Sequence, residues 1–282
     1  MAGEVLDQNP SRPQTRVREA GKWLLWRLLP RSWYQRVLAR AKVRDFRSGV
    51  FREPELDLVE LVLEPGGIAV DVGANHGMWT LAFSDAVGPE GIVLAFEPVP
   101  FTFGTLAAVA ARTEHSNVLL MAAGCSDVQG SFEMVIPDQD AGASDDLQAH
   151  LADRDGDADG AGSTSVTCEM VRLDDVLESL PRVDMIKLDI EGAELKALQG
   201  ARQSIIRHEP TVVCEVDRGY LAGFGQTPDE LSRFMSALGY DVYHYRSEDS
   251  KLMHMDSLDS VRHGNIVFAT PGNLGRLESL IP

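Results

Sequence analysis

The feature that most constrains the fold is an apolar run that leads through a glycine turn into a helical pattern. Residues 68–72 read IAVDV, residues 73–77 read GANHG, and a helical pattern follows over 79–87. A short apolar run next to glycine is typical of a buried strand in a parallel sheet. Because α/β proteins bind nucleotide-like ligands where such a strand turns into a helix, this stretch predicts an α/β fold with a ligand site at the turn.

The same alternation continues toward the C-terminus and predicts a mainly parallel sheet with helices on both faces. We expect strands at 68–72, 92–96, 118–122, 185–188, 211–215, 241–245 and 265–269, a hairpin of 131–136 with 166–172, and helices at 55–63, 79–87, 101–111, 173–180, 193–208 and 228–238. In such a sheet the ligand lies at the carboxyl ends of the strands. Five residues at predicted strand ends should meet at that edge: Gly73, Glu97, Gly124, Asp189 and Glu215.

Charge divides the chain into a basic N-terminal segment and an acidic body. The formal net charge is -17, whereas residues 1–50 hold 11 Lys or Arg against 4 Asp or Glu. We therefore expect an N-terminal tail and helical arm at 1–50 and one α/β domain at 51–275. The acidic body argues against nucleic acid as a partner.

Within the N-terminal segment, residues 14–42 predict a helix that breaks or kinks at Pro30. Trp26, Leu29, Trp33 and Val37 fall on one face of this helix. Two interpretations are open: a helical cap whose aromatic side chains pack on the main domain, and a surface-lying membrane anchor or substrate lid. The chain shows neither a signal-peptide pattern nor a run of about 20 apolar residues. We expect a cytoplasmic protein, with peripheral contact at the inner membrane surface as the alternative.

An acidic segment at 138–165 interrupts the predicted hairpin. It is rich in Asp, Gly and Ala and has no aromatic residue, which is typical of a solvated loop. The stretch DGDADG at 155–160 matches the first half of a calcium loop, but Val166 stands where the bidentate Glu is needed. We therefore predict no metal site. The cysteines Cys125, Cys168 and Cys214 have neither disulfide nor metal spacing and indicate a reduced protein.

The residues in and before the glycine turn indicate which ligand it binds. A dinucleotide site needs G-x-G-x-x-G, but Asn75 and Met78 stand where the second and third glycines belong. Asp71 places a carboxylate beside the loop, which repels a pyrophosphate and attracts a ligand with an ammonium and a sulfonium. S-adenosylmethionine is such a ligand, and we expect Asp71, Gly73, Asn75 and Gly77 to bind it. A Rossmann-type NAD-dependent oxidoreductase is the alternative.

Two further strand ends complete the predicted cofactor site. Glu97 ends the second strand, where an acid can accept hydrogen bonds from both ribose hydroxyls. Ser126 and Asp127 follow the third strand, and a side chain such as Asp127 can accept from the adenine amine. A surface acid and a plain turn are the alternatives for these positions.

The fourth strand end, IKLDIEGAE at 186–194, carries the residues expected to do the chemistry. Lys187 and Asp189 share a strand face, and Glu191 lies in the following turn. A hydroxyl acceptor needs a group that takes its proton, so Asp189 and Glu191 are the candidate base and acceptor-positioning residues. Lys187 could lower their pKa or contact the acceptor. Helix capping by Glu191 or Glu194, and a divalent ion held by the paired acids, are the alternatives.

Taken together, these motifs resemble the FkbM family of S-adenosylmethionine-dependent methyltransferases over residues 50–270. The resemblance rests on LEPG at 63–66, VDVGANxG at 70–77, FEP at 96–98, RLDD at 172–175, IKLDIEG at 186–192 and ExxxLxGA at 194–201. It implies a Rossmann-like class I methyltransferase fold with an antiparallel last strand. It also implies O-methylation of a hydroxyl on a sugar, glycolipid or polyketide-type natural product. The residues that it places at the cofactor are Asp71, Gly73, Asn75, Gly77 and Glu97, and those at the acceptor are Lys187, Asp189 and Glu191. A non-catalytic peripheral membrane protein that uses the N-terminal arm is the remaining alternative.

Overall fold

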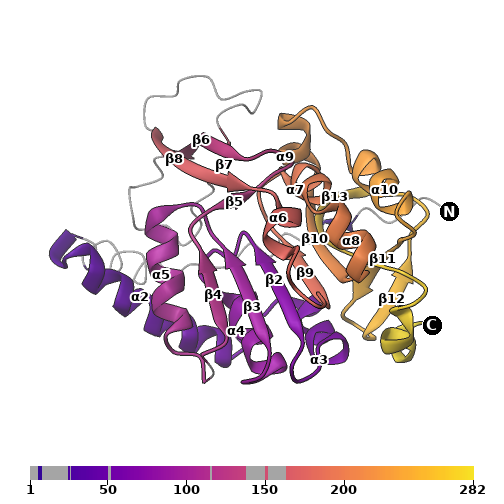
Figure 1. Cartoon of the computed structure of the whole chain (residues 1–282), viewed down its shortest axis with the longest axis horizontal. Helices are drawn as coiled ribbons and strands as arrows, with labels where there is room; N and C mark the ends of the chain where they lie inside the picture. The colour runs from indigo at the N-terminus through magenta and orange to yellow at the C-terminus, as the bar shows by residue number, and fades with distance from the viewer. Residues whose placement is uncertain are drawn as a thin grey trace.

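A mainly parallel sheet forms the centre of the computed structural model, which describes residues 6–7, 25, 27–49, 52–114, 116–137, 150–151 and 163–282. Its order is β12-β11-β13-β10-β9-β2-β3-β4, and β1 pairs with β13 (Figure 1). The strands are β1 (Leu6–Asp7), β2 (Ile68–Val72), β3 (Ile92–Phe96), β4 (Val118–Met121), β9 (Met185–Leu188), β10 (Thr211–Asp217), β11 (Asp241–Arg246), β12 (Lys251–His254) and β13 (Val261–Ala269). β13 runs antiparallel to β10 and β11, which confirms the predicted antiparallel last strand.

Helices cover both faces of this sheet, as the alternation predicted. One face packs under α3 (Val59–Val62) and α4 (Met78–Val87), and α5 (Pro100–Ala110) lies at the β4 side. The opposite face of the sheet is covered by the helices α6 (Leu173–Leu177), α7 (Glu194–Gly200), α8 (Arg202–His208), α9 (Arg218–Gly223) and α10 (Pro228–Ser236). Short 3-10 helices occur at η1 (Pro54–Leu58) and η2 (Leu274–Leu280). Neighbouring residues of β2 enter different cores, Ala69 on the α4 side and Val70 on the α7 side, because side chains alternate along a strand.

A second, four-stranded sheet lies above the carboxyl edge of the main one (Figure 1). Its order is β5 (Gly124–Cys125), β8 (Ser163–Val171), β6 (Gly130–Pro137) and β7 (His150–Leu151). The antiparallel pairing of β6 with β8 confirms the predicted hairpin. Most of the acidic segment, including the calcium-like stretch at 155–160, lies outside the described residues.

The structure differs from the predicted helix at 193–208, which is two helices with a break at Ala201. A Cβ at Gly200 would overlap the carbonyl oxygen of Ser126, so α7 approaches that loop closely at its end. The chain turns there and resumes as α8. The predictions also lacked α9 and β12, which are short elements of 6 and 4 residues.

The N-terminal arm forms α2 (Arg31–Arg47), and the predicted break at Pro30 is confirmed. The helix packs on α5: the rings of Tyr34 and Phe101 stack with centroids 6.2 Å apart, and Gln35 Nε2 donates to the Phe101 carbonyl at 3.0 Å. Further along, Ala39 and Val43 pack against Val109. Residues 14–24 and Trp26 of the predicted helix lie outside the described residues.

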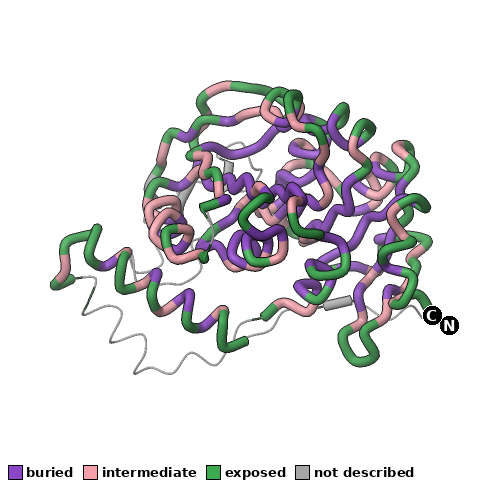
Figure 2. The backbone as a smooth tube through the Cα atoms, turned by 60° about the horizontal axis from the view of Figure 1, so that its bottom comes forward, coloured by how far each residue is buried: buried purple, intermediate pink, exposed green. Residues whose placement is uncertain are grey.

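The face of α2 that docks is not the predicted one. Trp33 is 61% exposed and Val37 is also exposed, whereas Tyr34, Ala39 and Val43 are buried. The expectation that Trp33 packs on the main domain is therefore wrong, and Tyr34 is the aromatic residue that packs there. Figure 2 shows buried and exposed positions alternating along α2. Among the described helices, none is both long enough and apolar enough to cross a bilayer.

Candidate active site

The turn between β2 and α4 is shaped by two glycines that no other residue could replace without strain. Gly73 has φ +77°, and a Cβ there would overlap the Asp189 carbonyl oxygen. Gly77 has φ +86° and lies against Leu106, which a Cβ would approach to 2.9 Å. Only glycine adopts such angles freely, and Asn75, at φ +48°, is among the residue types that tolerate them best. The close approach at Gly73 brings the cofactor loop and the end of β9 into direct contact.

The amides of this turn are already engaged within the protein. Gly73 and Ala74 donate to the Phe96 carbonyl at 3.0 and 2.9 Å, and Gly77 donates to Ala74 at 2.7 Å. The Asn75 amide donates to Glu97 Oε2 at 3.0 Å. A pyrophosphate cradle depends on free amides at the turn. These four amides are therefore not available to a phosphate, which argues against a dinucleotide at this turn.

Asp71 lies buried beneath the turn and ties β2 to the first turn of α4. It is 2% exposed, and its Oδ2 accepts a hydrogen bond from Thr80 Oγ1 at 2.5 Å. Burial raises the pKa of Asp71 to about 7, although the Thr80 hydroxyl and the nearby Lys187 charge oppose the rise. A cation bound beside this carboxyl would favour its ionised form.

Glu97 joins the ends of two loops through its two carboxylate oxygens. Oε2 accepts from the Asn75 amide at 3.0 Å, and Oε1 accepts from the Val99 amide at 2.9 Å. Burial raises the pKa of Glu97 to about 7, and the two amides oppose that rise. Each oxygen has a second acceptor position, so Glu97 can still accept from a diol while it shapes the loop.

Ser126 and Asp127 are fixed by a separate group of contacts. The Ser126 amide donates to the Val171 carbonyl at 3.0 Å, and its hydroxyl donates to Asp127 Oδ1 at 3.0 Å. The backbone of Ser126 lies against Gly200 at the end of α7. Asp127 is exposed. These contacts do not test the predicted role of the pair at the adenine, which stays a prediction.

The polar residues of four adjacent strands share one sheet face near its carboxyl edge. The strand registers pair Asp71 with Lys187, Glu215 with Asn265 and Asp217 with His263. Because side chains alternate along strands, Asp189 lies on this face too. The sequence did not indicate that His263 and Asn265 belong to this group.

Lys187 is the buried centre of this group. Its side chain is 1% exposed, its Nζ donates to Asn265 Oδ1 at 2.6 Å, and it lies 5.4 Å from the centre of the Trp79 ring. The charges of Asp189, Glu53 and Glu215 outweigh the effect of burial and raise the pKa of Lys187. We expected Lys187 to line the acceptor side. The structure places its ammonium under Asn265, from where it acts on Asp189 by charge.

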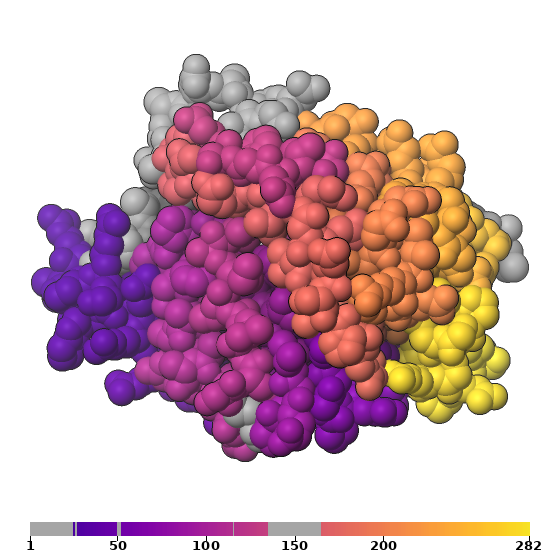
Figure 3. All heavy atoms as spheres, viewed as in Figure 1, coloured from indigo at the N-terminus to yellow at the C-terminus, as the bar shows by residue number. Residues whose placement is uncertain are grey.

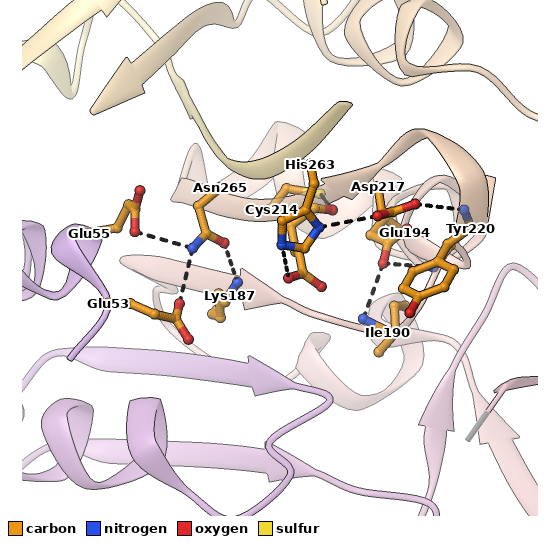
Figure 4. A network of polar contacts seen from close by, with 12 residues as sticks. Glu53, Glu55, Lys187, Ile190, Glu194, Cys214, Asp217, Tyr220, His263 and Asn265 are labelled. Carbon is orange, nitrogen blue, oxygen red and sulfur yellow. Dashed lines mark hydrogen bonds and ion pairs between the residues drawn. The ribbon is translucent and has the colours of Figure 1, made fainter. Parts of the chain in front are cut away.

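Two acids of the segment before β2 complete the network, and no sequence pattern indicated them. Asn265 Nδ2 donates to Glu53 Oε2 at 3.0 Å and to Glu55 Oε2 at 3.2 Å (Figure 4). Trp79 Nε1 also donates to Glu53 Oε2, at 2.9 Å. The network thus joins η1, α4, β9 and β13 around one buried cation.

A carboxyl pair with a histidine behind it lies beyond Lys187. Burial raises the pKa of Glu215 well above its ordinary value, and the charge of Asp189 and a hydrogen bond with it add to the rise. His263 Nε2 lies 3.6 Å from Glu215 Oε1, and its Nδ1 lies 3.2 Å from Asp217 Oδ2. Figure 4 shows His263 turned toward Asp217. The side chains of Glu215 and His263 are both partly exposed, so these two residues are in contact with solvent.

The turn after β9 holds Glu191 in an unusual backbone conformation. Glu191 has φ +56°, and the next residue, Gly192, lies where a Cβ would come within 2.5 Å of the Tyr220 carbonyl oxygen. Glu194 accepts from the Ile190 and Gly192 amides at 3.1 Å each, so it braces this turn rather than only the helix after it. A non-glycine residue in this region of φ costs ~1–3 kcal/mol and often marks a functional site.

Four buried carboxyls predict how stability depends on pH. Burial raises the pKa values of Glu55, Asp71, Glu97 and Glu194 to about 7 each, while in the unfolded chain they return to about 4. Between these values the folded protein binds more protons, so the free energy of unfolding falls as pH rises through 7. We expect calorimetry of the apoprotein to give a melting temperature roughly 5 °C or more lower at pH 8.5 than at pH 6.

A matched variant separates this effect from the general charge of the protein. Glu194→Gln removes one of the four groups and should flatten the dependence, whereas Glu90→Gln, an exposed residue, should leave it unchanged. A melting temperature that rises from pH 6 to pH 8.5 would contradict the assignment.

The fold and this edge of the sheet define a class of protein, the Rossmann-like class I methyltransferases. Residues 71–242 match the sequence profile of the methyltransferase FkbM domain. The match covers more than half of the chain, which therefore belongs to the FkbM methyltransferase family. The resemblance indicated by the motifs is confirmed, and with it S-adenosylmethionine as the cofactor.

Two relatives and one solved structure are similar to the chain. The chain is 27% identical to methyltransferase sdnD from Sordaria araneosa over 185 residues, which cover 58% of this chain and 70% of that protein. It is 31% identical to 31-O-demethyl-FK506 methyltransferase FkbM from Streptomyces tacrolimicus over 175 residues, or 55% and 66% of the two chains. The crystal structure of methyltransferase FkbM from Methylobacillus flagellatus KT is 19% identical with a TM-score of 0.44, and the match covers 89% of this chain and 59% of that chain.

Proposed function

We propose that this methyltransferase transfers the methyl group to oxygen, on a hydroxyl of a sugar, glycolipid or polyketide-type natural product. The observation that carries the proposal is the position of Asp189: its backbone lies against Gly73 of the turn, and its carboxyl group is close enough to act by charge on Asp71 and Glu215. The Streptomyces relative, named as a 31-O-demethyl-FK506 methyltransferase, supports oxygen as the acceptor atom. A neutral amine can attack the methyl group without a base, whereas a hydroxyl acceptor must lose its proton. A carboxyl group at this edge therefore favours a hydroxyl acceptor.

The residues of the turn would hold the cofactor as follows. Glu97 accepts from the ribose hydroxyls, and Asp71 lies where it attracts the positive charges of the methionine part. Gly73, Asn75 and Gly77 shape the turn around the ligand, and Ser126 with Asp127 frames the adenine. When bound, the cofactor supplies a methyl group on a positively charged sulfur.

Asp189 is the proposed base. Asp189 lies on the polar sheet face beside Glu215, whose pKa is raised by burial and by the charge of Asp189, and we assign it the role of accepting the hydroxyl proton. In methyl transfer to oxygen, the bound cofactor would supply the methyl group and Asp189 would take the proton that the acceptor hydroxyl loses. Glu191 positions the acceptor, since its strained turn faces the same edge. Lys187 and His263 are positioning residues: Lys187 acts on Asp189 by charge, and His263 links Glu215 to Asp217 and to solvent.

Calorimetry with S-adenosylhomocysteine and with NAD tests the cofactor part of the proposal. We expect binding of S-adenosylhomocysteine and none of NAD, because the amides at 73, 74, 75 and 77 are engaged. Binding of NAD alone would support an oxidoreductase and overturn the proposal. Binding of neither ligand would also count against it.

Replacing Glu97 by Ala should weaken binding of S-adenosylhomocysteine roughly 100-fold, because two charge-assisted hydrogen bonds to the ribose are lost. Asp71→Asn should weaken it less, because Asn can still accept from Thr80. Titration calorimetry measures both, with Glu90→Gln as the control on an exposed acid. An unchanged affinity in the Glu97 variant would remove Glu97 from the cofactor site.

A further inference from the structure

The outward face of α2 combines arginine side chains with exposed apolar ones. Positions 33, 36, 37, 40, 44 and 47 follow helical spacing and form one stripe. Its members are exposed: Trp33, Arg36, Val37, Arg40, Arg44 and Arg47. Just before the helix, Leu28 is 69% exposed and Leu25 is exposed as well. We call these residues the α2 outer face.

This face is not needed to attach the helix to the protein. The opposite side already packs on α5 through Tyr34, Ala39 and Val43. Asp45, the only acid in α2, is buried on that inner side. Within the described part of the chain, no carboxylate forms an ion pair with Arg36, Arg40 or Arg47. Figure 3 shows α2 (indigo) at one flank of the molecule, beside α5.

We propose that the α2 outer face docks on an anionic lipid bilayer. A bilayer surface accommodates both halves of the face: arginines meet lipid phosphates, and Trp33 and Leu28 enter the boundary between headgroups and acyl chains. A nucleic acid would satisfy the arginines but would leave the leucines in water. Attraction of this kind amounts to about a tenfold gain in affinity for each one to two cationic side chains.

The position of α2 relates this docking to the reaction. Its first turn contacts Phe101, four residues after Glu97, so the start of the helix lies beside the edge that holds the cofactor loop. Docking therefore brings that edge to the bilayer. Resting on the proposed function, the acceptor class is a hydroxyl compound carried at a lipid surface, such as a glycolipid, rather than one free in solution.

Sedimentation with vesicles tests the docking directly. The full chain is mixed with phosphatidylcholine vesicles that contain either no charged lipid or about one-third phosphatidylglycerol. We expect binding to the anionic vesicles only, weakened by salt because the attraction is electrostatic. Arg36→Glu with Arg40→Glu should weaken it by more than about 30-fold, because each change removes a positive charge and adds a negative one, and Trp33→Ser should weaken it roughly tenfold. The control pair Arg202→Glu with Arg262→Glu, exposed residues on other elements, should bind like wild type if the α2 outer face is responsible.

Separate readouts assign each failure to its cause. A variant that binds S-adenosylhomocysteine as tightly as the wild type is correctly folded. If the wild type itself did not bind this ligand, the proposed function would be contradicted, but the docking proposal would not. The docking proposal would be overturned if the wild type did not bind anionic vesicles. It would also be overturned if the Trp33 and arginine variants bound them as tightly as the wild type. Light scattering that shows a dimer disrupted by the same variants would assign the face to a second copy. Tighter binding to RNA than to vesicles would assign it to nucleic acid.

Discussion

Asp189→Asn is expected to lower kcat by roughly 10²- to 10⁴-fold while leaving affinity for S-adenosylhomocysteine within about twofold of wild type. The amide keeps the size of the side chain and cannot take the hydroxyl proton. The backbone contact with Gly73 is unaffected, since it involves the Asp189 carbonyl. Single-turnover measurement of methyl transfer, together with titration calorimetry, separates the chemical step from binding.

The control for this variant is Glu60→Gln, an exposed acid on α3 that should behave as wild type. If Asp189→Asn turned over at the wild-type rate, Asp189 would be removed from the mechanism. If cofactor affinity fell together with kcat, Asp189 would belong to the cofactor site instead.

Gly73→Ala is expected to lower the free energy of unfolding by ~3–5 kcal/mol, because the added Cβ overlaps the Asp189 carbonyl oxygen and φ is +77°. It should also abolish measurable cofactor binding, since β9 must move away from the turn. Denaturant titration gives the stability, and calorimetry with S-adenosylhomocysteine gives the affinity.

Gly66→Ala is a matched control for the backbone angle alone. Gly66 has φ +83°, and nothing lies within 4 Å of the position of its Cβ. It should lose only ~1–2 kcal/mol of stability and keep its affinity. Equal losses in the two variants would show that strain in φ, rather than the approach of Asp189, explains the role of Gly73.

Much of the fold could be predicted from the sequence because its signals are local. The strands at 68–72, 92–96 and 185–188 are apolar runs bounded by turns, and the structure has them at those positions. Gly73 follows its strand in sequence, so its place at the carboxyl edge needed only the parallel arrangement. The break at Ala201 was missed; the adjacent Gly200 lies against Ser126, a tertiary contact that the local sequence does not reveal.

The candidate site was less predictable wherever it depends on register. His263 and Asn265 lie 46 and 50 positions from Asp217 and Glu215, the β10 residues that they face, and only the antiparallel pairing of β13 brings them together. Their one local signal is that two polar residues share a face of an otherwise apolar strand. Lys187 was selected for its chemistry. Its burial under Asn265 could not be predicted, because Asn265 lies on β13, far from Lys187 in the sequence. The docked face of α2 was mistaken because Trp33 suggested burial, while the small Ala39 allows the close packing on α5.

Transfer of an isotope-labelled methyl group from S-adenosylmethionine tests the central claim most directly. The protein is incubated with labelled cofactor and an extract of hydroxyl-bearing natural products and glycolipids, and the labelled product is examined by mass spectrometry and NMR. We predict that the label appears in an O-methyl ether, and that Asp189→Asn lowers its formation at least 100-fold. A label found on nitrogen or carbon, or formed equally fast without Asp189, would contradict the account.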